Sequence, residues 1–324
     1  MGGGLAGGGG HVAVLVNECL TSLAAASGEV YVDATAGLGG HAVAFGRCVG
    51  PGGLVVLNDV DPGNLERAAV AVRTTGSRVE AMRGNFADLP RRLTEAGLTA
   101  DAMLADLGFS SNQMEDGARG LSFMRDGPLD MRLDPSLPIT AAELVNSLPE
   151  RELVSLLREF GEEPGAARIA RNIVQVRRSS PITSTGQLAE VVRGAIGKGN
   201  GRIDPSTRSF QALRIAVNDE MGALDAFLAA IGRAARALKA GARPGWINPG
   251  ARIGIITFHS LEDRRVKRAF GELVREGVAT DVSGRGRGGV IEAGEAEVGQ
   301  NPRSRSAKLR VIRVGEVTPG TDRV

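Results

Sequence analysis

Cysteine and aromatic residues are both scarce in this chain of 324 residues. Two cysteines, Cys19 and Cys48, are too few for a disulfide framework or a cluster of metal ligands, so we expect neither disulfides nor a bound metal. Aromatic residues make up 3% of the chain, which excludes an extensive stacking platform of the kind that single-strand binders use. Any base held by this protein would depend on a few side chains.

Long apolar runs are also missing. No uninterrupted apolar stretch approaches the length that spans a bilayer, and the first residues lack a basic region followed by an apolar stretch. We therefore expect a soluble, cytoplasmic protein with no membrane partner. Residues 1–10 are nearly all glycine and predict a flexible tail.

The overall charge does not by itself indicate a nucleic-acid binder, because 39 Lys and Arg residues stand against 37 Asp and Glu residues, for a net charge of +2. The basic residues are nevertheless clustered. The clusters are Arg168, Arg171, Arg177 and Arg178; Arg285 and Arg287; and Arg303, Arg305, Lys308 and Arg310. Such clusters suit phosphate contacts, although a run of charges more often forms a solvated face.

The pattern of apolar residues divides the chain into two domains. Short apolar runs of strand character alternate with helical patterns over residues 11–116 and return over 215–324, which predicts one α/β domain. Between these parts, apolar residues recur at helical spacing and prolines stand at the expected helix starts. We expect an inserted, all-helical domain over 117–214. The segment 277–301 is rich in glycine and glutamate and predicts a mobile loop.

The most informative segment runs from Val30 to His41, where an apolar run ends in an acidic, glycine-rich turn and a helix is predicted to follow. Glycine permits positive φ and lets the backbone approach a ligand closely, while the first N–H groups of the next helix point to the same place. The segment therefore predicts a nucleotide-binding turn. An ordinary strand-to-helix turn is the alternative interpretation, because this spacing alone is a weak signal.

Two acidic residues bear on which nucleotide this turn binds. Asp59, about twenty residues after the turn, is placed to accept both hydroxyls of a ribose, as in NAD-binding proteins. Asp33 precedes the first glycine at the mouth of the strand, where it would repel a pyrophosphate but attract the ammonium or sulfonium of an amino-acid-bearing cofactor. Both cofactors would use the carboxylate of Asp59, so it is Asp33, together with the polar ends of the apolar runs that follow, that favours S-adenosylmethionine over NAD.

Polar or glycine residues follow each of the next apolar runs. The runs at 54–57, 79–82 and 102–105 lead to Asp59, to Gly84 and Phe86, and to Asp106. In an open α/β sheet, ligands lie beyond the carboxyl ends of the strands, so we expect these residues to converge on one crevice.

Asp106 is a candidate for chemistry on an exocyclic amine. The lone pair of such an amine is delocalised into the ring, and an acceptor that holds the amine hydrogens lets the lone pair localise toward a methyl sulfonium. A helix N-cap or a contact to the cofactor are the other interpretations of Asp106.

The α/β pattern closes with predicted strands at 252–257 and 308–314. His259 follows the first of these strands and would face the same crevice, where it would contact the substrate or handle a proton. A satisfied structural histidine is the alternative.

Six motifs occur in the order of a known family. They are Gly39-Gly40-His41, Asp59-Val60-Asp61-Pro62, Asp106 to Gln113 (DLGFSSNQ), Arg119 to Arg132 (RGLSFMRDGPLDMR), Arg208 to Ile215 (RSFQALRI) and Phe258 to Arg264 (FHSLEDR). Together they resemble the bacterial ribosomal RNA small subunit methyltransferase H family, over about His11 to Arg313. The long central motif and the motif at Phe258 are very specific, whereas the glycine turn is not. Ser209 stands where the family usually has Thr.

The resemblance implies a class I S-adenosylmethionine-dependent methyltransferase with a Rossmann-like α/β sheet and an inserted helical domain that recognises RNA. It implies methyl transfer to the N4 amine of a cytosine, expected to be cytosine 1402, in the decoding region of 16S rRNA, with S-adenosylhomocysteine as product. The expected partner is 16S rRNA within the small ribosomal subunit. The sequence leaves open whether naked RNA is a substrate and whether the protein is a homodimer.

The resemblance also implies a set of cofactor contacts. They are Gly39, Gly40, His41, Asp59, Phe86, Asp106 and Gln113, to which the charge argument adds Asp33. The N–H groups of the glycine turn would meet the methionyl carboxylate, Asp59 the ribose hydroxyls, and Phe86 would cover the adenine. Gln113 would bind the cofactor or the base.

Two other functions stay open from the residues alone. An NAD-dependent oxidoreductase would use the same glycine turn, and NAD binding without any response to S-adenosylhomocysteine would support it. A non-catalytic RNA-binding or assembly factor would keep the fold without the reaction.

Overall fold

The computed structural model describes residues 13–197, 204–283 and 289–315, which fall into two compact units. The sheet unit consists of residues 13–108 and 223–315, and the helical unit of Phe109–Gly222. The helical unit extends beyond the predicted insertion of 117–214 at both ends. The glycine tail and the cluster of Arg285 and Arg287 lie outside the described residues.

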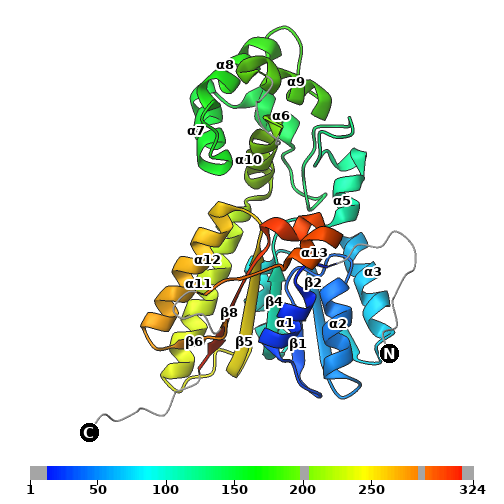
Figure 1. Cartoon of the computed structure of the whole chain (residues 1–324), viewed down its shortest axis with the longest axis vertical. Helices are drawn as coiled ribbons and strands as arrows, with labels where there is room; N and C mark the ends of the chain where they lie inside the picture. The colour runs from blue at the N-terminus through cyan, green and yellow to red at the C-terminus, as the bar shows by residue number, and fades with distance from the viewer. Residues whose placement is uncertain (1–12, 198–203, 284–288, 316–324) are drawn as a thin grey trace. The chain divides into compact units, whose positions relative to one another are not determined.

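The sheet unit is built on one sheet with the strand order β3-β2-β1-β4-β5-β8-β6, and β7 pairs with β8 (Figure 1). The strands are β1 (Val30–Asp33), β2 (Leu54–Asp59), β3 (Arg78–Arg83), β4 (Ala100–Asp106), β5 (Ile247–Thr257), β6 (Ala279–Asp281), β7 (Ile291–Glu292) and β8 (Lys308–Val314). The first five strands are parallel, and β8 is antiparallel to its neighbours. The predicted Rossmann-like α/β sheet is confirmed.

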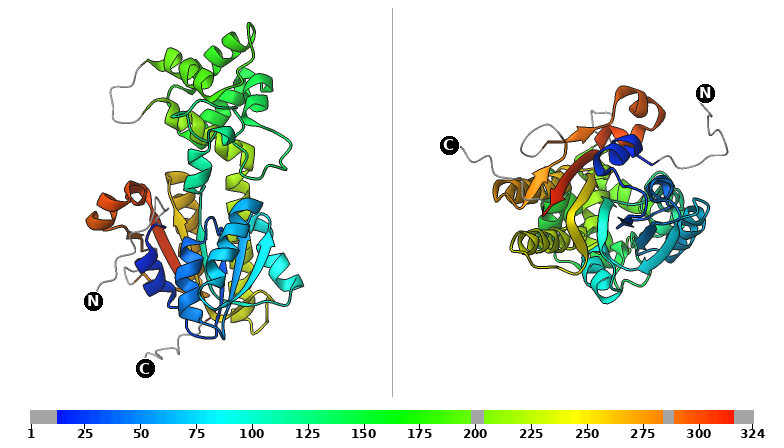
Figure 2. Two further views of the ribbon diagram at one scale, coloured as in Figure 1. Left: turned by 90° about the vertical axis from the view of Figure 1, so that its right-hand side faces the viewer. Right: turned by 90° about the horizontal axis from the view of Figure 1, so that it is seen from below.

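Two layers of helices cover this sheet (Figure 2). One face carries α1 (Val16–Leu23), α2 (Gly40–Val49) and α3 (Pro62–Arg73), and the other carries α4 (Leu89–Glu95), α11 (Glu220–Lys239) and α12 (Ser260–Arg275). Apolar side chains fill both interfaces: Leu23 and Phe45 pack on the first face, and Leu93, Phe227 and Phe270 pack on the second. Strands buried on both faces must be apolar along their whole length, which explains the continuous runs in the sequence.

The connections around β1 predict a ligand site at the carboxyl ends of the central strands. The crossovers from β1 to β3 use α2 and α3 on one face, whereas the crossover from β3 to β4 uses α4 on the other face. The strand order therefore reverses between β1 and β4, and open sheets bind ligands at the carboxyl ends of strands at such a point. Asp33 ends β1 and Asp106 ends β4.

The prediction of a mobile loop over 277–301 is wrong for its described part. β6 and β7 both pair with β8, and α13 (Glu295–Gln300) follows them before the short 3₁₀ helix η3 (Pro302–Ser306). Pairing with the buried strand β8 supplies the stability that the local sequence lacks. Among the helices of the described residues, none combines the length and apolar composition needed to cross a bilayer.

The helical unit packs around its own apolar core. Its helices are α5 (Ser111–Glu115), η2 (Gly117–Arg119), α6 (Ala141–Ser147), α7 (Glu150–Gly161), α8 (Ala166–Arg177), α9 (Thr185–Ile196) and α10 (Ser206–Asn218). The starts of α6 and α9 carry capping boxes, formed by Thr140 with Glu143 and by Ser184 with Gln187. These starts and the helical periodicity agree with the sequence prediction.

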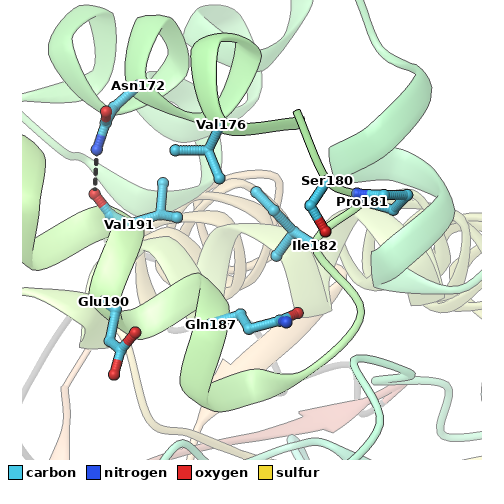
Figure 3. A pocket seen from close by; sticks show the side chains of 8 residues that line it. All are labelled: Asn172, Val176, Ser180, Pro181, Ile182, Gln187, Glu190 and Val191. Carbon is cyan, nitrogen blue, oxygen red and sulfur yellow. Dashed lines mark hydrogen bonds between the residues drawn. The ribbon is translucent and has the colours of Figure 1, made fainter. Parts of the chain in front are cut away.

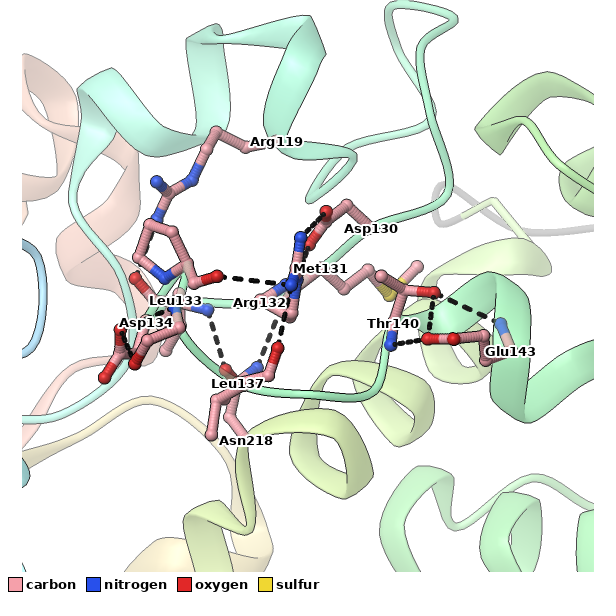
Figure 4. A network of polar contacts seen from close by, with 12 residues as sticks. Arg119, Asp130, Met131, Arg132, Leu133, Asp134, Leu137, Thr140, Glu143 and Asn218 are labelled. Atoms are coloured by element: carbon pink, nitrogen blue, oxygen red, sulfur yellow. Dashed lines mark hydrogen bonds and ion pairs between the residues drawn. The ribbon is translucent and has the colours of Figure 1, made fainter.

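The long central motif forms a tightly held loop within the helical unit (Figure 4). Asn218, at the end of α10, accepts a hydrogen bond from the Leu133 N–H at 2.7 Å and donates one to the Met131 carbonyl at 2.8 Å. Met131 is fully buried and has a φ of 65°, an unfavourable value for a residue with a side chain. Arg132 binds both carboxylate oxygens of Asp130. These contacts hold a strained loop in one conformation.

Candidate active site

Steric contacts explain the glycines of the nucleotide-binding turn. Gly39 precedes the first residue of α2 with a φ of 85°, and a Cβ atom there would lie 3.0 Å from the backbone of Ala68. A Cβ atom on Gly40 would lie 2.8 Å from the side chain of Ala13. The turn is therefore closed to larger residues, and the amino end of α2 is directed beyond the sheet edge, where helix N–H groups bind anions.

Asp59, the last residue of β2, is held by backbone N–H groups. Its Oδ2 accepts a hydrogen bond from Gly37 at 2.7 Å, and its Oδ1 accepts one from Asp61 at 2.8 Å. Burial nevertheless raises the pKa of Asp59 to about 6. Each oxygen has a second lone pair, so the carboxylate can also receive the two hydroxyls of a ribose.

Asp33 is buried more deeply, with 2% of the residue exposed. The N–H of Thr35 donates to its Oδ1 at 3.2 Å. Burial, with a contribution from the charge of Asp59, raises the pKa of Asp33 to about 7. A carboxylate in this place is stabilised by a positively charged ligand.

Asp106 is the last residue of β4, and the hydrogen-bonding capacity of its carboxylate is only partly used. Its side chain is 23% exposed, yet Oδ1 is buried and has no hydrogen-bond partner within the described residues. Burial, together with the charges of Asp33 and Glu262, raises the pKa of Asp106 well above its ordinary value. Asp106 is not the N-cap of the following helix, because Ser110 takes that place in a capping box at the start of α5.

The positions and charges of the three carboxylates can be compared with the groups of the cofactor implied by the resemblance. They lie at the carboxyl ends of three neighbouring strands, and Asp33 interacts electrostatically with both Asp59 and Asp106. All three have raised pKa values, so each gains stability from a cation or a hydrogen-bond donor. S-adenosylmethionine offers an ammonium, a sulfonium and two ribose hydroxyls, and therefore fits this site. A pyrophosphate would add negative charge beside Asp33.

His41 lies in the first turn of α2 and is 5% exposed. Its Nε2 lies 2.8 Å from the carbonyl oxygen of Val14, and its Nδ1 lies 3.8 Å from Oδ2 of Asp106. The segment before α1 is held in turn by α13, because the Leu15 N–H donates to Glu297 at 2.7 Å. The imidazole thus has structural contacts of its own, whereas the sequence favoured neither the backbone nor the imidazole of His41 as the functional part.

Phe86 begins the 3₁₀ helix η1 (Phe86–Asp88) and is half-buried. Its ring packs edge-to-face on Phe227 with centroids 5.6 Å apart. Beside it, Arg92 donates to Oδ1 of Asn58 at 2.8 Å and to the carbonyl of Asn85 at 2.7 Å. Arg92 therefore fixes the ends of β2 and β3 around Phe86, a role that no sequence motif indicated.

His259 follows β5, as predicted, and precedes the first residue of α12. Its Nε2 lies 3.1 Å from Oε1 of the buried Glu262. The other oxygen of Glu262 accepts hydrogen bonds from the N–H groups of Phe258 and His259. These contacts give His259 a structural partner, and a role in the reaction stays a prediction.

Gln113 belongs to the helical unit, in α5, and is 5% exposed. Its Oε1 accepts a hydrogen bond from the Ser110 N–H at 3.0 Å. The amide therefore has a capping function within its own helix, and its predicted contact with the cofactor or the base stays a prediction.

A pocket of about 350 Å³ lies between α8 and α9 in the helical unit (Figure 3). It is lined by Asn172, Val176, Ser180, Pro181, Ile182, Gln187, Glu190 and Val191. None of the residues predicted to bind the cofactor lines it, so this pocket is separate from the cofactor site.

The basic clusters differ in exposure. Arg168, Arg171 and Arg178 are exposed on and after α8, whereas Arg177 donates to the carbonyl of Val145. Arg310 is only 5% exposed and binds Asp263 at 2.8 Å. Arg310 is therefore a structural residue, whereas Arg305 of the same cluster is exposed, as are three arginines of the α8 cluster.

Comparison with known proteins gives one consistent result. Residues 9–314 match the model of the MraW methylase family. The chain is 44% identical over 317 residues to a protein named ribosomal RNA small subunit methyltransferase H from Syntrophotalea carbinolica, covering 94% of this chain and 97% of that protein. A protein of the same name from Geobacter sulfurreducens is 42% identical, covering 93% and 97% of the two chains.

Similarities to solved structures are weaker. The crystal structure of a putative rRNA-methylase from Clostridium thermocellum is 10% identical with a TM-score of 0.43, covering 94% of this chain and 99% of that chain. TrmN from Thermus thermophilus is 14% identical with a TM-score of 0.39, covering 93% and 48%. The assignment of the fold rests on the strand order of the sheet rather than on these values.

Proposed function

Because the chain belongs to the MraW methylase family, we propose that it transfers a methyl group from S-adenosylmethionine to the N4 amine of a cytosine in 16S rRNA. The proposed target is cytosine 1402 of the small ribosomal subunit, and the proposed site of action is the cytoplasm. The relatives named ribosomal RNA small subunit methyltransferase H support this choice of RNA, since they cover nearly the whole chain.

One observation carries the assignment of the reaction. Three carboxylates with raised pKa values, those of Asp33, Asp59 and Asp106, lie at the ends of neighbouring strands beside a glycine turn. This arrangement is suited to a cationic cofactor with a ribose and poorly suited to NAD. Within the described part of the chain, it also leaves one carboxylate, that of Asp106, with a buried oxygen at the strand end that has no hydrogen-bond partner.

The cofactor supplies an electrophilic methyl group, and the residues of this chain do the positioning and the proton chemistry. Asp59 receives the ribose hydroxyls, Asp33 balances the positive charge, and Phe86 covers the adenine. Asp106 accepts the hydrogens of the N4 amine, which localises the nitrogen lone pair, and then takes the proton that the amine loses. Gly40 and His41 contribute backbone N–H groups to the methionyl carboxylate, whereas the N–H of Gly39 donates to the Ala36 carbonyl at 2.8 Å and Gly39 contributes by letting the backbone approach the cofactor closely. Gln113 and His259 are proposed to contact the cofactor or the base.

The helical unit supplies recognition of the RNA in this proposal. Arg168, Arg171 and Arg178 are exposed around α8 and suit contacts with phosphates. The target base must leave its stack to reach the strand ends, so these contacts would hold the RNA while one cytosine is extruded.

The test is methyl transfer from labelled S-adenosylmethionine to small ribosomal subunits isolated from a strain that lacks this activity, followed by nucleoside analysis. Wild-type protein is expected to place the label in N4-methylcytidine. Asp106→Asn, which keeps the size of the side chain, is expected to lose at least about a hundredfold in rate. Calorimetry with S-adenosylhomocysteine controls for folding and cofactor binding. Cofactor binding without label in any cytidine would reject the RNA substrate.

A further inference from the structure

We propose that the imidazole of His41 is a positioning residue for the reaction, which carries a positive charge beside Asp106 and keeps that carboxylate ionised for proton acceptance. This inference rests on the proposed methylation of an amine, because only such a reaction requires Asp106 to take up a proton. It goes beyond the backbone contact that the glycine turn provides.

The hydrogen bond to Val14 determines where His41 carries hydrogen. A carbonyl oxygen can only accept, so the short contact of 2.8 Å between Nε2 and the Val14 carbonyl requires a hydrogen on Nε2. The opposite ring atom, Nδ1, lies 3.8 Å from Oδ2 of Asp106. If His41 were neutral and Asp106 ionised, a lone pair would face a carboxylate oxygen. One proton shared by the pair removes this conflict, and as imidazolium and carboxylate the two attract each other.

Burial makes this pairing effective. His41 is 5% exposed, and the distance of 3.8 Å is within the range of an ion pair although it is too long for a direct hydrogen bond. Little solvent separates the two groups, so their interaction is screened less than that of a surface pair.

The other titratable groups around the pair oppose ionisation of Asp106. Asp33 from β1 and Glu262 from α12 both raise the pKa of Asp106, and burial acts in the same direction. Cys19 from α1 has a strongly raised pKa and stays neutral, and Asp59 from β2 acts on Asp33. A cation on His41 counteracts these effects, because it lies 3.8 Å from Oδ2 of Asp106.

The proton balance follows from the reaction. The bond from N4 to the methyl carbon forms as the bond from that carbon to sulfur breaks, and the electron pair of the broken bond stays on sulfur. The amine nitrogen then loses a proton, and the ionised Asp106 accepts it. The pair of His41 and Asp106 ends with two protons and releases one to solvent after the products leave.

Two substitutions of His41 separate this role from a structural one. His41→Gln keeps an N–H group near the position of Nε2 and can preserve the Val14 contact, whereas His41→Asn keeps a polar atom near Nδ1 and loses that contact. Neither side chain can carry a positive charge. Both variants are therefore expected to lower kcat near pH 7 by about tenfold or more and to move the acid limb of the kcat profile about one pH unit higher, because Asp106 without its cation ionises at higher pH.

The measurements are kcat over a range of pH on small ribosomal subunits, and the Kd of S-adenosylhomocysteine by calorimetry. His41→Gln is expected to bind S-adenosylhomocysteine within about threefold of wild type, since the neutral hydrogen bond to Val14 remains. Normal activity and an unshifted pH profile in His41→Gln, with a defect confined to His41→Asn, would show that the imidazole only supports Val14. Failure of the wild-type protein to methylate the subunit would instead reject the proposed function itself.

Discussion

The main-chain N–H of Asp106 donates a hydrogen bond to the hydroxyl of Thr35 across 2.7 Å. This contact fastens the end of β4 to the turn that follows β1, although the two residues are far apart in the sequence. It determines where the Asp106 carboxylate lies relative to Asp33, whose carboxylate accepts a hydrogen bond from the N–H of the same Thr35.

Thr35→Val is expected to uncouple the two strand ends. The substitution keeps the shape of the side chain and removes the acceptor, so the N–H of Asp106 loses its partner, at a cost of about 1–3 kcal/mol if water does not replace it. Urea unfolding measures this cost. We expect the rate of methyl transfer to fall more than the affinity for S-adenosylhomocysteine, because Asp106 moves while the glycine turn stays.

Thr35→Ser is the matched control for this prediction, since it restores the hydroxyl without the methyl group. It is expected to return most of the stability and rate. If Thr35→Val and Thr35→Ser have the same stability and the same rate of methyl transfer, the hydroxyl does not position Asp106.

Arg252 and Glu29 form an ion pair near the start of β1, away from the carboxyl ends of the strands. Arg252 donates to both oxygens of Glu29, at 3.0 and 2.6 Å, and also to the carbonyl groups of Leu23 and Ala24 that end α1. Burial alone would raise the pKa of Glu29, but hydrogen bonds from Arg252 and Ala26 lower it below its ordinary value.

Arg252→Met is expected to lower the free energy of unfolding by about 2–4 kcal/mol, because the Glu29 carboxylate loses its charged donor and keeps the N–H of Ala26, while two carbonyl groups lose the donors of Arg252. At a temperature where the variant is folded, its kcat is expected to equal that of wild type. Urea unfolding and a methylation assay check both statements. A large loss of kcat in a fully folded variant would contradict the separation of this ion pair from the active site.

Much of this arrangement could be predicted from the sequence. The central strands β2 and β4 are largely buried and contain continuous apolar runs, and the strand predicted at 308–314 agrees with β8 residue for residue. The helices of the insertion have apolar residues at helical spacing and prolines near their starts, so they could be predicted from the sequence. Asp33, Asp59 and Asp106 were predicted as site residues because each follows a strand, and parallel strands end at the same edge of a sheet.

The remaining features depend on contacts between distant segments, which no local pattern encodes. β6 and β7 form by pairing with β8, although they lie within a segment, 277–301, whose glycine and glutamate content favours a loop. His41 meets Val14, and Arg92 meets Asn58 and Asn85, only after the helices have packed on the sheet. The sequence indicated which residues could carry chemistry and left their partners undetermined.

Asn218→Ala tests the loop of the long central motif. The substitution removes the contacts with Leu133 and Met131 that hold this loop against α10. With φ at 65°, Met131 is expected to leave its strained conformation once this support is lost. We expect a loss of stability of about 2 kcal/mol and a higher KM for ribosomal subunits. An unchanged Kd for S-adenosylhomocysteine, measured by calorimetry, would show that the sheet unit is intact, whereas an unchanged KM would exclude this loop from RNA recognition.

Charge reversal on α8 tests the proposed contact with RNA. Arg171→Glu and Arg178→Glu change exposed side chains and are expected to leave folding within about 0.5 kcal/mol of wild type. Each lost phosphate contact should raise KM several-fold. It should also reduce the slope of the logarithm of the binding constant against the logarithm of the salt concentration by about one. Glu159→Arg, on the neighbouring α7, is a matched control for a change of charge at an exposed position. A decrease in KM from Glu159→Arg as large as the increases from the two arginine variants would indicate a general response to charge rather than a contact.

The ligand-free protein should lose stability as the pH rises through neutrality. Burial raises the pKa of Asp33 from 3.8 to about 7, so the folded protein binds this proton more tightly than the unfolded chain. The resulting stability is fully present below the unfolded pKa and is lost as the pH rises through the folded pKa. The loss amounts to at most about 4 kcal/mol, since one pKa unit corresponds to about 1.4 kcal/mol.

Asp33→Asn isolates this contribution, because the amide cannot ionise and nearly matches the size of the protonated carboxyl. Urea unfolding at several pH values from about 5 to 8 gives the free energy of unfolding of wild type and of Asp33→Asn. As the pH increases, wild type is expected to lose stability relative to Asp33→Asn. Saturating S-adenosylmethionine is expected to reverse this trend, because its positive charge stabilises the ionised Asp33 and binding should therefore tighten with pH. A difference that does not vary with pH would mean that Asp33 is ionised throughout this range, and the carboxylate would then need a cationic partner within the free protein.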